Sequence, residues 1–281
     1  MLIRRVESQV RLSRANPRYR RAWIPDDPRR AMILVHGYAE HCGRYDEMAM
    51  FFARHGFAVH AYDQAGHGRS PGPRGDVDRF ERMLDELMSF VDFVSGEHPN
   101  LPRTLVGHSM GGLVVAATSA FRAPDVERLV LSGALLELGA DTPFWKQMAA
   151  KLLAPFGARV GLSVGLDPDG LSRDPEVGRR YEADPYVKDR MSARFASGMM
   201  TMIERTRAAA NQIERPTLLL HGEDDPMSPV SGSRAFHAGL SRTIADDCRL
   251  RVYPGLRHEI FHEPERQQVW RDILDWMGDP T

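Results

Sequence analysis

The sequence predicts an α/β fold with a mostly parallel central sheet, flanking helices and an inserted helical segment. Short apolar runs alternate with amphipathic runs along most of the 281 residues, as strands and helices do in such folds. The alternation stops near residue 134 and resumes near residue 213. The composition, 42% hydrophobic and 27% charged, is that of a globular protein and excludes disordered, collagen-like and coiled-coil chains.

The elements before the insertion follow in a regular order. Two N-terminal strands, expected to be antiparallel, precede the continuous apolar run 31–35, which is typical of a buried parallel strand. The spacing of Phe80, Met83, Leu84 and Leu87 marks one apolar face of a long helix. In total we expect strands at 6–12, 18–24, 31–35, 57–62, 104–106 and 129–131, and helices at 44–55, 76–98 and 110–121.

The middle of the chain holds helix-like pieces without clear strands. These pieces lie at 144–154 and 188–210, on either side of a loop rich in Gly, Asp and Pro. An insertion over one edge of an α/β sheet is usually a lid that shapes specificity. We therefore expect a core formed by 1–133 and 214–281, with a helical cap at 134–213. In the second core piece we expect strands at 217–220 and 249–253 and helices at 231–240 and 266–277.

One apolar stripe in the cap has two interpretations. The stripe packs onto the core, or it forms a lipid-facing entry surface, since amphipathic helices with basic flanks lie on membranes. Its members are Phe144, Trp145, Met148, Leu152, Leu153 and Phe156.

Charge and cysteine content further restrict the class of protein and its cellular compartment. The 37 Lys and Arg against 38 Asp and Glu give a net charge of −1, which argues against a nucleic-acid binder. Two cysteines fit a reduced compartment, and no stretch of signal-peptide or membrane-span length is present. We expect a cytoplasmic protein, with peripheral membrane contact through the cap and the oligomeric state left open.

The residues 107–111 form a G-x-S-x-G motif between an apolar strand and an apolar helix. A turn from strand to helix this tight requires small residues around the Ser and exposes its hydroxyl near the helix N-terminus. This context predicts that Ser109 is a nucleophile. The alternative is a glycine-rich turn that happens to contain a serine.

A serine nucleophile needs a base, and the base needs a carboxylate that orients it. Asp224 and Asp225 follow one apolar strand, and His258 follows the next. Loops beyond the carboxyl ends of strands are where open α/β sheets place their sites. We therefore predict His258 as the base and Asp225 as the acid, with Asp224 as its rival.

The loop after the strand 31–35 is the candidate oxyanion site. Backbone N–H groups of Tyr38 and Met110 would bind the negative charge of a tetrahedral intermediate. The alternative is a plain turn between a strand and a helix.

Motifs of one family recur along the chain, in the stretches HGYAEHCGRY, AYDQAGHGRS, GHSMGG, LLLHGEDDPMSP and YPGLRHEIFHE. Together they resemble the monoacylglycerol lipase and lysophospholipase branch of the α/β-hydrolases. The resemblance covers the chain from about residue 31 to its end. It implies the α/β-hydrolase fold, a Ser109–Asp225–His258 triad under a helical cap, hydrolysis of a small lipid ester such as a monoacylglycerol, and no cofactor.

The resemblance also implies residue roles. The family's Gly-x-x-Asp matches 222–225, which favours Asp225 over Asp224. In relatives a Glu, an Arg and a cap Tyr lie near the glycerol end of the substrate, and these map onto Glu40, Arg44 and Tyr181. The chain departs from the mammalian enzymes at Tyr38, where they carry a small residue, and this puts the pocket width near the Ser in doubt.

Other functions stay open from the sequence alone. A lysophospholipase, a short-chain carboxylesterase, a thioesterase and a non-catalytic ligand-binding relative would share these motifs. The stretch 258–262 also reads H-E-x-x-H, the zinc-protease motif. Pro254 before it and Pro264 after it leave little room for the helix that zinc binding needs, so we expect no metal.

Overall fold

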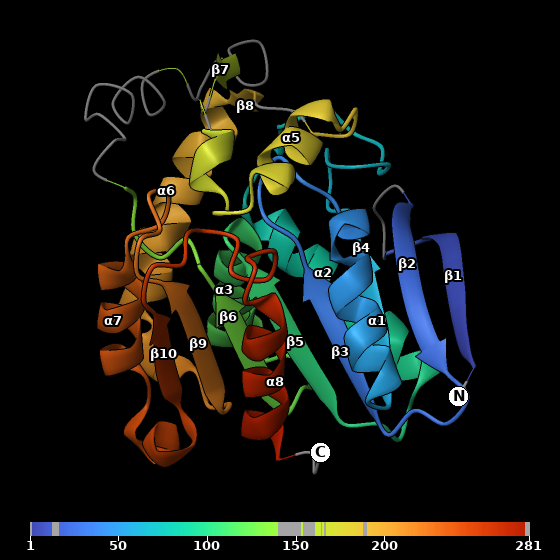
Figure 1. Ribbon diagram of the computed structural model, residues 1–281. Helices are drawn as coiled ribbons and strands as arrows, with labels where there is room; N and C mark the ends of the chain where they lie inside the picture. The colour runs from blue at the N-terminus through green and yellow to red at the C-terminus, as the bar shows by residue number, and fades with distance from the viewer. Residues whose placement is uncertain are drawn as a thin grey trace.

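The computed structural model describes residues 2–12, 17–139, 153, 161–163, 165, 167–187 and 190–278. Within these residues an eight-stranded sheet has the order β1-β2-β4-β3-β5-β6-β9-β10, and β7 pairs separately with β8 (Figure 1). The strands are β1 Ile3–Val10, β2 Arg18–Pro25, β3 Arg30–Val35, β4 Phe57–Tyr62, β5 Arg103–His108, β6 Arg128–Ser132, β7 Gly161–Ser163, β8 Arg190–Ser192, β9 Thr217–Gly222 and β10 Arg249–Tyr253.

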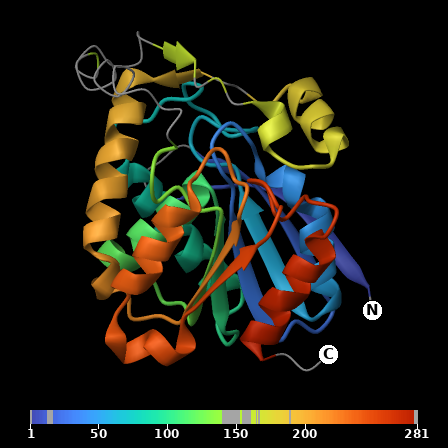
Figure 2. The ribbon, with the colours of Figure 1, turned by 60° about the vertical axis from the view of Figure 1, so that its left-hand side comes forward.

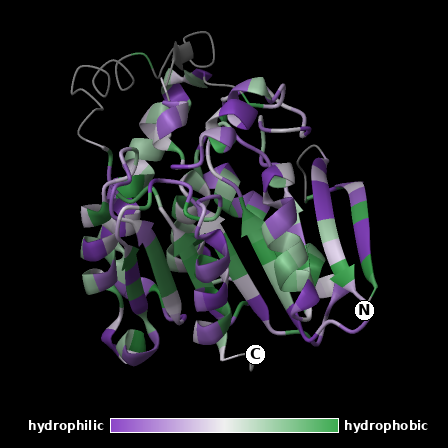
Figure 3. Cartoon of the chain, in the orientation of Figure 1, coloured by the Kyte–Doolittle hydropathy of each residue, from purple (hydrophilic) through white to green (hydrophobic). Residues whose placement is uncertain are grey.

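The sheet is mostly parallel, which confirms the predicted α/β class. β1 with β2 and β2 with β4 are antiparallel, and every pairing from β4 across to β10 is parallel. The middle strands are buried and largely hydrophobic (Figure 3). Such burial on both faces is what a parallel sheet covered by helices requires.

Helices cover both faces of the sheet (Figure 2). α1 and α8 pack on one face, where Phe52 and Trp270 belong to one buried apolar cluster. α2, α3, α6 and α7 pack on the other, where Leu87, Leu113 and Phe236 belong to a second cluster. The helices are α1 Asp46–Arg54, α2 Glu81–Glu97, α3 Met110–Arg122, α5 Pro175–Ala183, α6 Ala193–Ala208, α7 Val230–Gly239 and α8 Arg266–Met277.

Two predicted helices begin later than the sequence indicated. The helix expected from residue 76 begins at Glu81, because Asp76 is instead held by two residues at the start of α6. Its carboxylate accepts hydrogen bonds from Ser192 Oγ and from Arg194 Nε, the latter at 2.8 Å. The helix expected from residue 188 begins at Ala193, where the Ser192 hydroxyl accepts from Phe195 N at 3.2 Å and caps it.

The segment between β6 and β9 departs from the prediction in two described places. It was expected to hold no strand, but β7 and β8 form a short antiparallel pair. It also holds the helix α5, which begins with an Asp174 cap and Pro175. Because β6 and β9 are neighbours in the sheet, the chain leaves and rejoins the core at one place. Of the predicted helix at 144–154 the structure describes residue 153 alone, which is helical. The other members of the apolar stripe lie outside the described residues: Phe144, Trp145, Met148, Leu152 and Phe156.

Candidate active site

Ser109 stands at a sharp turn between β5 and α3. Its backbone has φ 53° and ψ −121°, a conformation that non-glycine residues adopt at strained, functional turns. The turn packs closely against β3, because a Cβ on Gly111 would lie 2.1 Å from the Val35 carbonyl oxygen. This contact is the physical reason for the small residues around the Ser, as the motif predicted.

Asp225 and His258 are brought together by the loops that follow β9 and β10. The loops hydrogen-bond to each other, with Asp224 N donating to Leu256 O at 3.0 Å. They approach so closely that a Cβ on Gly222 would lie 2.3 Å from the same Leu256 oxygen. As a result His258 Nδ1 lies 2.7 Å from Asp225 Oδ2.

The geometry selects Asp225 over Asp224 as the partner of His258. The Asp225 carboxylate is fully buried, and its Oδ1 accepts from Met227 N at 2.8 Å and Ser228 N at 2.9 Å. Asp224 is exposed. Burial opposes charge on Asp225, but the attraction of His258 and hydrogen bonds from His221 and His258 prevail and lower the Asp225 pKa.

The contact with Asp225 decides which nitrogen His258 would use in its predicted role as the base. Nδ1 donates to ionised Asp225, so in the neutral imidazole Nε2 carries the lone pair. Burial disfavours the charged ring, but Asp225 outweighs burial and raises the pKa of His258. The ring packs against His108, the residue before Ser109, with 4.8 Å between ring centroids.

The loop that follows β3 lies against Ser109. A Cβ on Gly37 would be 3.0 Å from the Cβ of Ser109, so the next residue, Tyr38, is close to the candidate nucleophile. Met110 is the first residue of α3, and the first N–H groups of a helix have no partner within it. The structure thus brings together the two residues predicted to form the oxyanion hole, and that role stays a prediction.

Glu40 and Arg44 belong to a buried network under this loop. Glu40 Oε1 accepts from Gly37 N and from Tyr45 OH, the latter at 2.8 Å, and Oε2 lies 3.3 Å from Arg44 Nη1. Arg44 also holds Glu259, the neighbour of His258. Burial, followed by the charge of Glu259, raises the pKa of Glu40, although Arg44 opposes the shift. These contacts indicate that Glu40 and Arg44 stabilise the loop that follows β3. Binding of the substrate head group by these two residues stays a prediction.

Tyr181 extends the network into the segment predicted to form the cap. It lies on α5, is buried, and packs with Ala39 and Leu171. The Arg44 guanidinium lies over its ring, 5.2 Å from the centroid, which is a cation–π distance. The structure therefore places Glu40, Arg44 and Tyr181 together, as the resemblance implied.

His221 is a residue of this region that the sequence analysis missed. It is fully buried on β9, and its Nε2 lies 3.2 Å from Asp225 Oδ2. The sequence feature that could have identified His221 is its position, four residues before the predicted acid and near the end of the apolar strand that precedes it.

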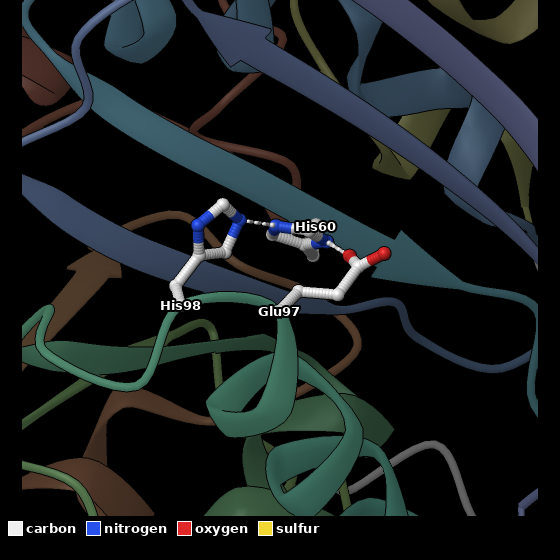
Figure 4. A group of neighbouring side chains, drawn as sticks. All are labelled: His60, Glu97 and His98. Atoms are coloured by element: carbon white, nitrogen blue, oxygen red, sulfur yellow. Dashed lines mark hydrogen bonds and ion pairs between the residues drawn. The ribbon is translucent and has the colours of Figure 1, made fainter.

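Among the described residues, one group has metal-ligand chemistry: His60, Glu97 and His98 (Figure 4). His60 Nε2 lies 3.1 Å from His98 Nε2, and Arg20 holds the Glu97 carboxylate through two hydrogen bonds of 2.6 and 3.0 Å. His60 Nδ1 lies 3.7 Å from Glu97 Oε2, and the three residues lie on β4 and at the end of α2. We propose no ion there.

The H-E-x-x-H stretch does not form a helix. The residues 258–265 form turns and bends. His258 contacts Asp225, while His262 Nε2 lies 3.0 Å from Arg44 O, so the two rings have different partners.

In the described part of the chain, no helix has the length and apolar character to cross a membrane.

A nucleophile elbow over a parallel sheet, with a histidine held by a buried aspartate, defines a serine hydrolase of the α/β-hydrolase fold. Comparison with known families agrees. A family model described as "Serine aminopeptidase, S33" matches residues 26–265, and the chain belongs to this family.

Individual relatives are similar over nearly the whole chain. A monoacylglycerol lipase of Mycolicibacterium smegmatis is 37% identical over 257 residues, which cover 91% of this chain and 90% of the relative. The crystal structure of Paleococcus ferrophilus monoacylglycerol lipase has a TM-score of 0.83 and 34% identity, covering 92% of this chain and 98% of that one. A soluble variant of Saccharomyces cerevisiae monoglyceride lipase, in complex with a substrate analogue, has a TM-score of 0.87 and 24% identity, covering 100% and 97%. This last likeness bears on the fold alone.

Proposed function

We propose that this serine hydrolase cleaves monoacylglycerols to a fatty acid and glycerol. The observation that carries the hydrolysis is the 2.7 Å contact between His258 Nδ1 and buried Asp225 beside the Ser109 elbow. The monoacylglycerol lipases that are similar over about nine-tenths of the chain support the choice of substrate.

The proposed reaction follows from the positions of these groups. Ser109 attacks the ester carbonyl while His258 Nε2 takes the hydroxyl proton. The N–H groups of Tyr38 and Met110 hold the oxyanion of the tetrahedral intermediate. His258 then protonates the leaving glycerol oxygen, activates a water that releases the fatty acid, and regenerates the serine. Asp225 stays ionised and stabilises the imidazolium.

The substrate's two free hydroxyls need partners when the site closes over them, because an unpaired buried polar group costs about 1–3 kcal/mol. We assign this role to Glu40, Arg44 and Tyr181. The segment 134–213 acts as the cap that closes the site. Its peripheral contact with a membrane and a cytoplasmic location are part of the proposal.

A substrate panel tests this function. Purified protein is assayed on a monoacylglycerol, the ethyl ester of the same fatty acid, a lysophospholipid, p-nitrophenyl acetate and an amino-acid p-nitroanilide. The monoacylglycerol has the highest kcat/KM if the proposal holds, and this activity survives EDTA because no step uses a metal. A preference for the lysophospholipid, the acetate or the anilide would contradict the proposed function and would indicate a lysophospholipase, a short-chain esterase or a peptidase, respectively.

A further inference from the structure

His221 makes a set of contacts that the triad mechanism does not use. Its Nε2 lies 2.7 Å from the carbonyl oxygen of Ser228 and 3.2 Å from Asp225 Oδ2. Both atoms are acceptors, so Nε2 must carry a hydrogen. On the other side of the ring, Nδ1 lies 2.8 Å from Ser233 Oγ. In the neutral ring Nδ1 accepts, so the serine hydroxyl donates.

This orientation completes the donor set around Asp225. Oδ1 accepts two backbone N–H groups, from Met227 and Ser228. Oδ2 accepts from His258 at 2.7 Å and faces the Nε2–H of His221 at 3.2 Å. The oxygen that contacts His258 therefore also faces the Nε2–H of His221, which it shares with the Ser228 carbonyl and which comes from the end of β9 rather than from the loop.

The second contact of His221 fixes the loop itself. The same Nε2–H reaches the Ser228 carbonyl, and the Ser228 N–H donates to Asp225 Oδ1 at 2.9 Å. His221 thus holds the acid directly through Oδ2 and indirectly through the loop backbone. Its side chain is completely buried, so in the intact protein these contacts are made without competition from bulk solvent.

We propose that His221 is a positioning residue, whose Nε2–H bonds the Ser228 carbonyl and faces Asp225 Oδ2, and so keeps this oxygen where it accepts from His258. The inference rests on the proposed function, because it presupposes that Asp225 and His258 are the acid and base. It assigns catalytic importance to a residue that touches neither the substrate nor the base.

Two amide variants separate this role from simple packing. In His221→Gln the amide N–H reaches the position of Nε2, whereas in His221→Asn the shorter side chain reaches only that of Nδ1. We expect His221→Asn to lower kcat on p-nitrophenyl butyrate about 10- to 100-fold with KM changed less than about twofold. His221→Gln should restore kcat to within about threefold of the wild type. Ser233→Ala, which removes only the partner of Nδ1, serves as the control and should also stay within about threefold.

A double-mutant cycle with Asp225→Ala tests whether the effect passes through the acid. In the Asp225→Ala background, His221→Asn should produce no further fall in kcat. Equal kcat for the Gln and Asn variants, a Ser233→Ala loss as large as that of His221→Asn, or a full additional loss in the Asp225→Ala background would each overturn the positioning role. If Asp225→Ala alone left kcat unchanged, the triad of the proposed function would fail instead.

Discussion

Arg44 donates two hydrogen bonds to Glu259, with Nη1 2.6 Å from Oε1 and Nη2 2.9 Å from Oε2. Glu259 directly follows His258, and Arg44 also lies 3.3 Å from Glu40, which accepts the Gly37 N–H. One buried guanidinium therefore ties the loop beside Ser109 to the loop that carries the proposed base. Removing one partner from such a buried group is costly, because it leaves an uncompensated charge.

Glu40→Ala should reveal both bracing and head-group recognition. Loss of the acceptor for Gly37 N–H disturbs the oxyanion loop, so hydrolysis of a fatty-acid ethyl ester should slow about 5- to 150-fold, the equivalent of 1–3 kcal/mol. The preference for the glyceryl ester over the ethyl ester should fall as well. Steady-state kinetics on the two esters give both quantities.

The two outcomes for Glu40→Ala are independent. An unchanged rate on the ethyl ester would contradict bracing of the loop. An unchanged ratio between the two esters would remove Glu40 from head-group recognition.

Asp225→Asn should lower kcat by roughly 10⁴, because the amide stabilises the wrong tautomer of His258. Asp224→Asn is the matched control: the residue is adjacent in sequence but exposed, and we expect a change below about threefold. Ester hydrolysis by the two purified variants compares them. A larger loss in Asp224→Asn would give the acid role to Asp224.

The pH dependence should report the raised pKa of His258. Protonated His258 cannot accept the Ser109 proton, so kcat/KM should fall as pH drops below that pKa. The midpoint should lie above 6.5, the ordinary histidine value, because Asp225 raises it against burial. In Asp225→Asn the midpoint should move down, and the pH dependence of fluorophosphonate labelling gives it even where turnover is slow. A wild-type midpoint below 6.5, or no movement in the variant, would disagree with the geometry.

If the predicted cap forms an apolar site for the acyl chain, longer chains should raise activity until that site is full. Each buried CH₂ contributes about 0.8 kcal/mol, which is about a fourfold gain in kcat/KM. A series of monoacylglycerols from C4 upward measures the slope. A steady fall from the shortest ester onward would indicate a short-chain esterase.

Residues near the ends of strands could be predicted because local patterns mark them. Ser109 lies in a short motif, and Asp225 and His258 each follow an apolar run, so the topology of a parallel sheet gathers them. The pair Arg44 and Glu259 could not be predicted, because the partners are 215 residues apart and no local pattern joins them.

Local signals failed where tertiary contacts decide the structure. Asp76 sits in a sequence with helical spacing, yet its carboxylate is taken by Ser192 and Arg194 and the helix begins five residues later. α5 was missed because it is a polar helix with few apolar residues. Its Asp174 cap and Pro175 were visible in the sequence and typical of a helix start.

Glycerol release from a monoacylglycerol by the wild type and by Ser109→Ala tests the central claim most directly. Loss of the nucleophile should reduce kcat by about 10⁶, while the thermal unfolding transition remains and fluorophosphonate labelling disappears. A folded Ser109→Ala protein that kept even about a hundredth of the wild-type rate would contradict the assignment of Ser109, and with it the proposed triad.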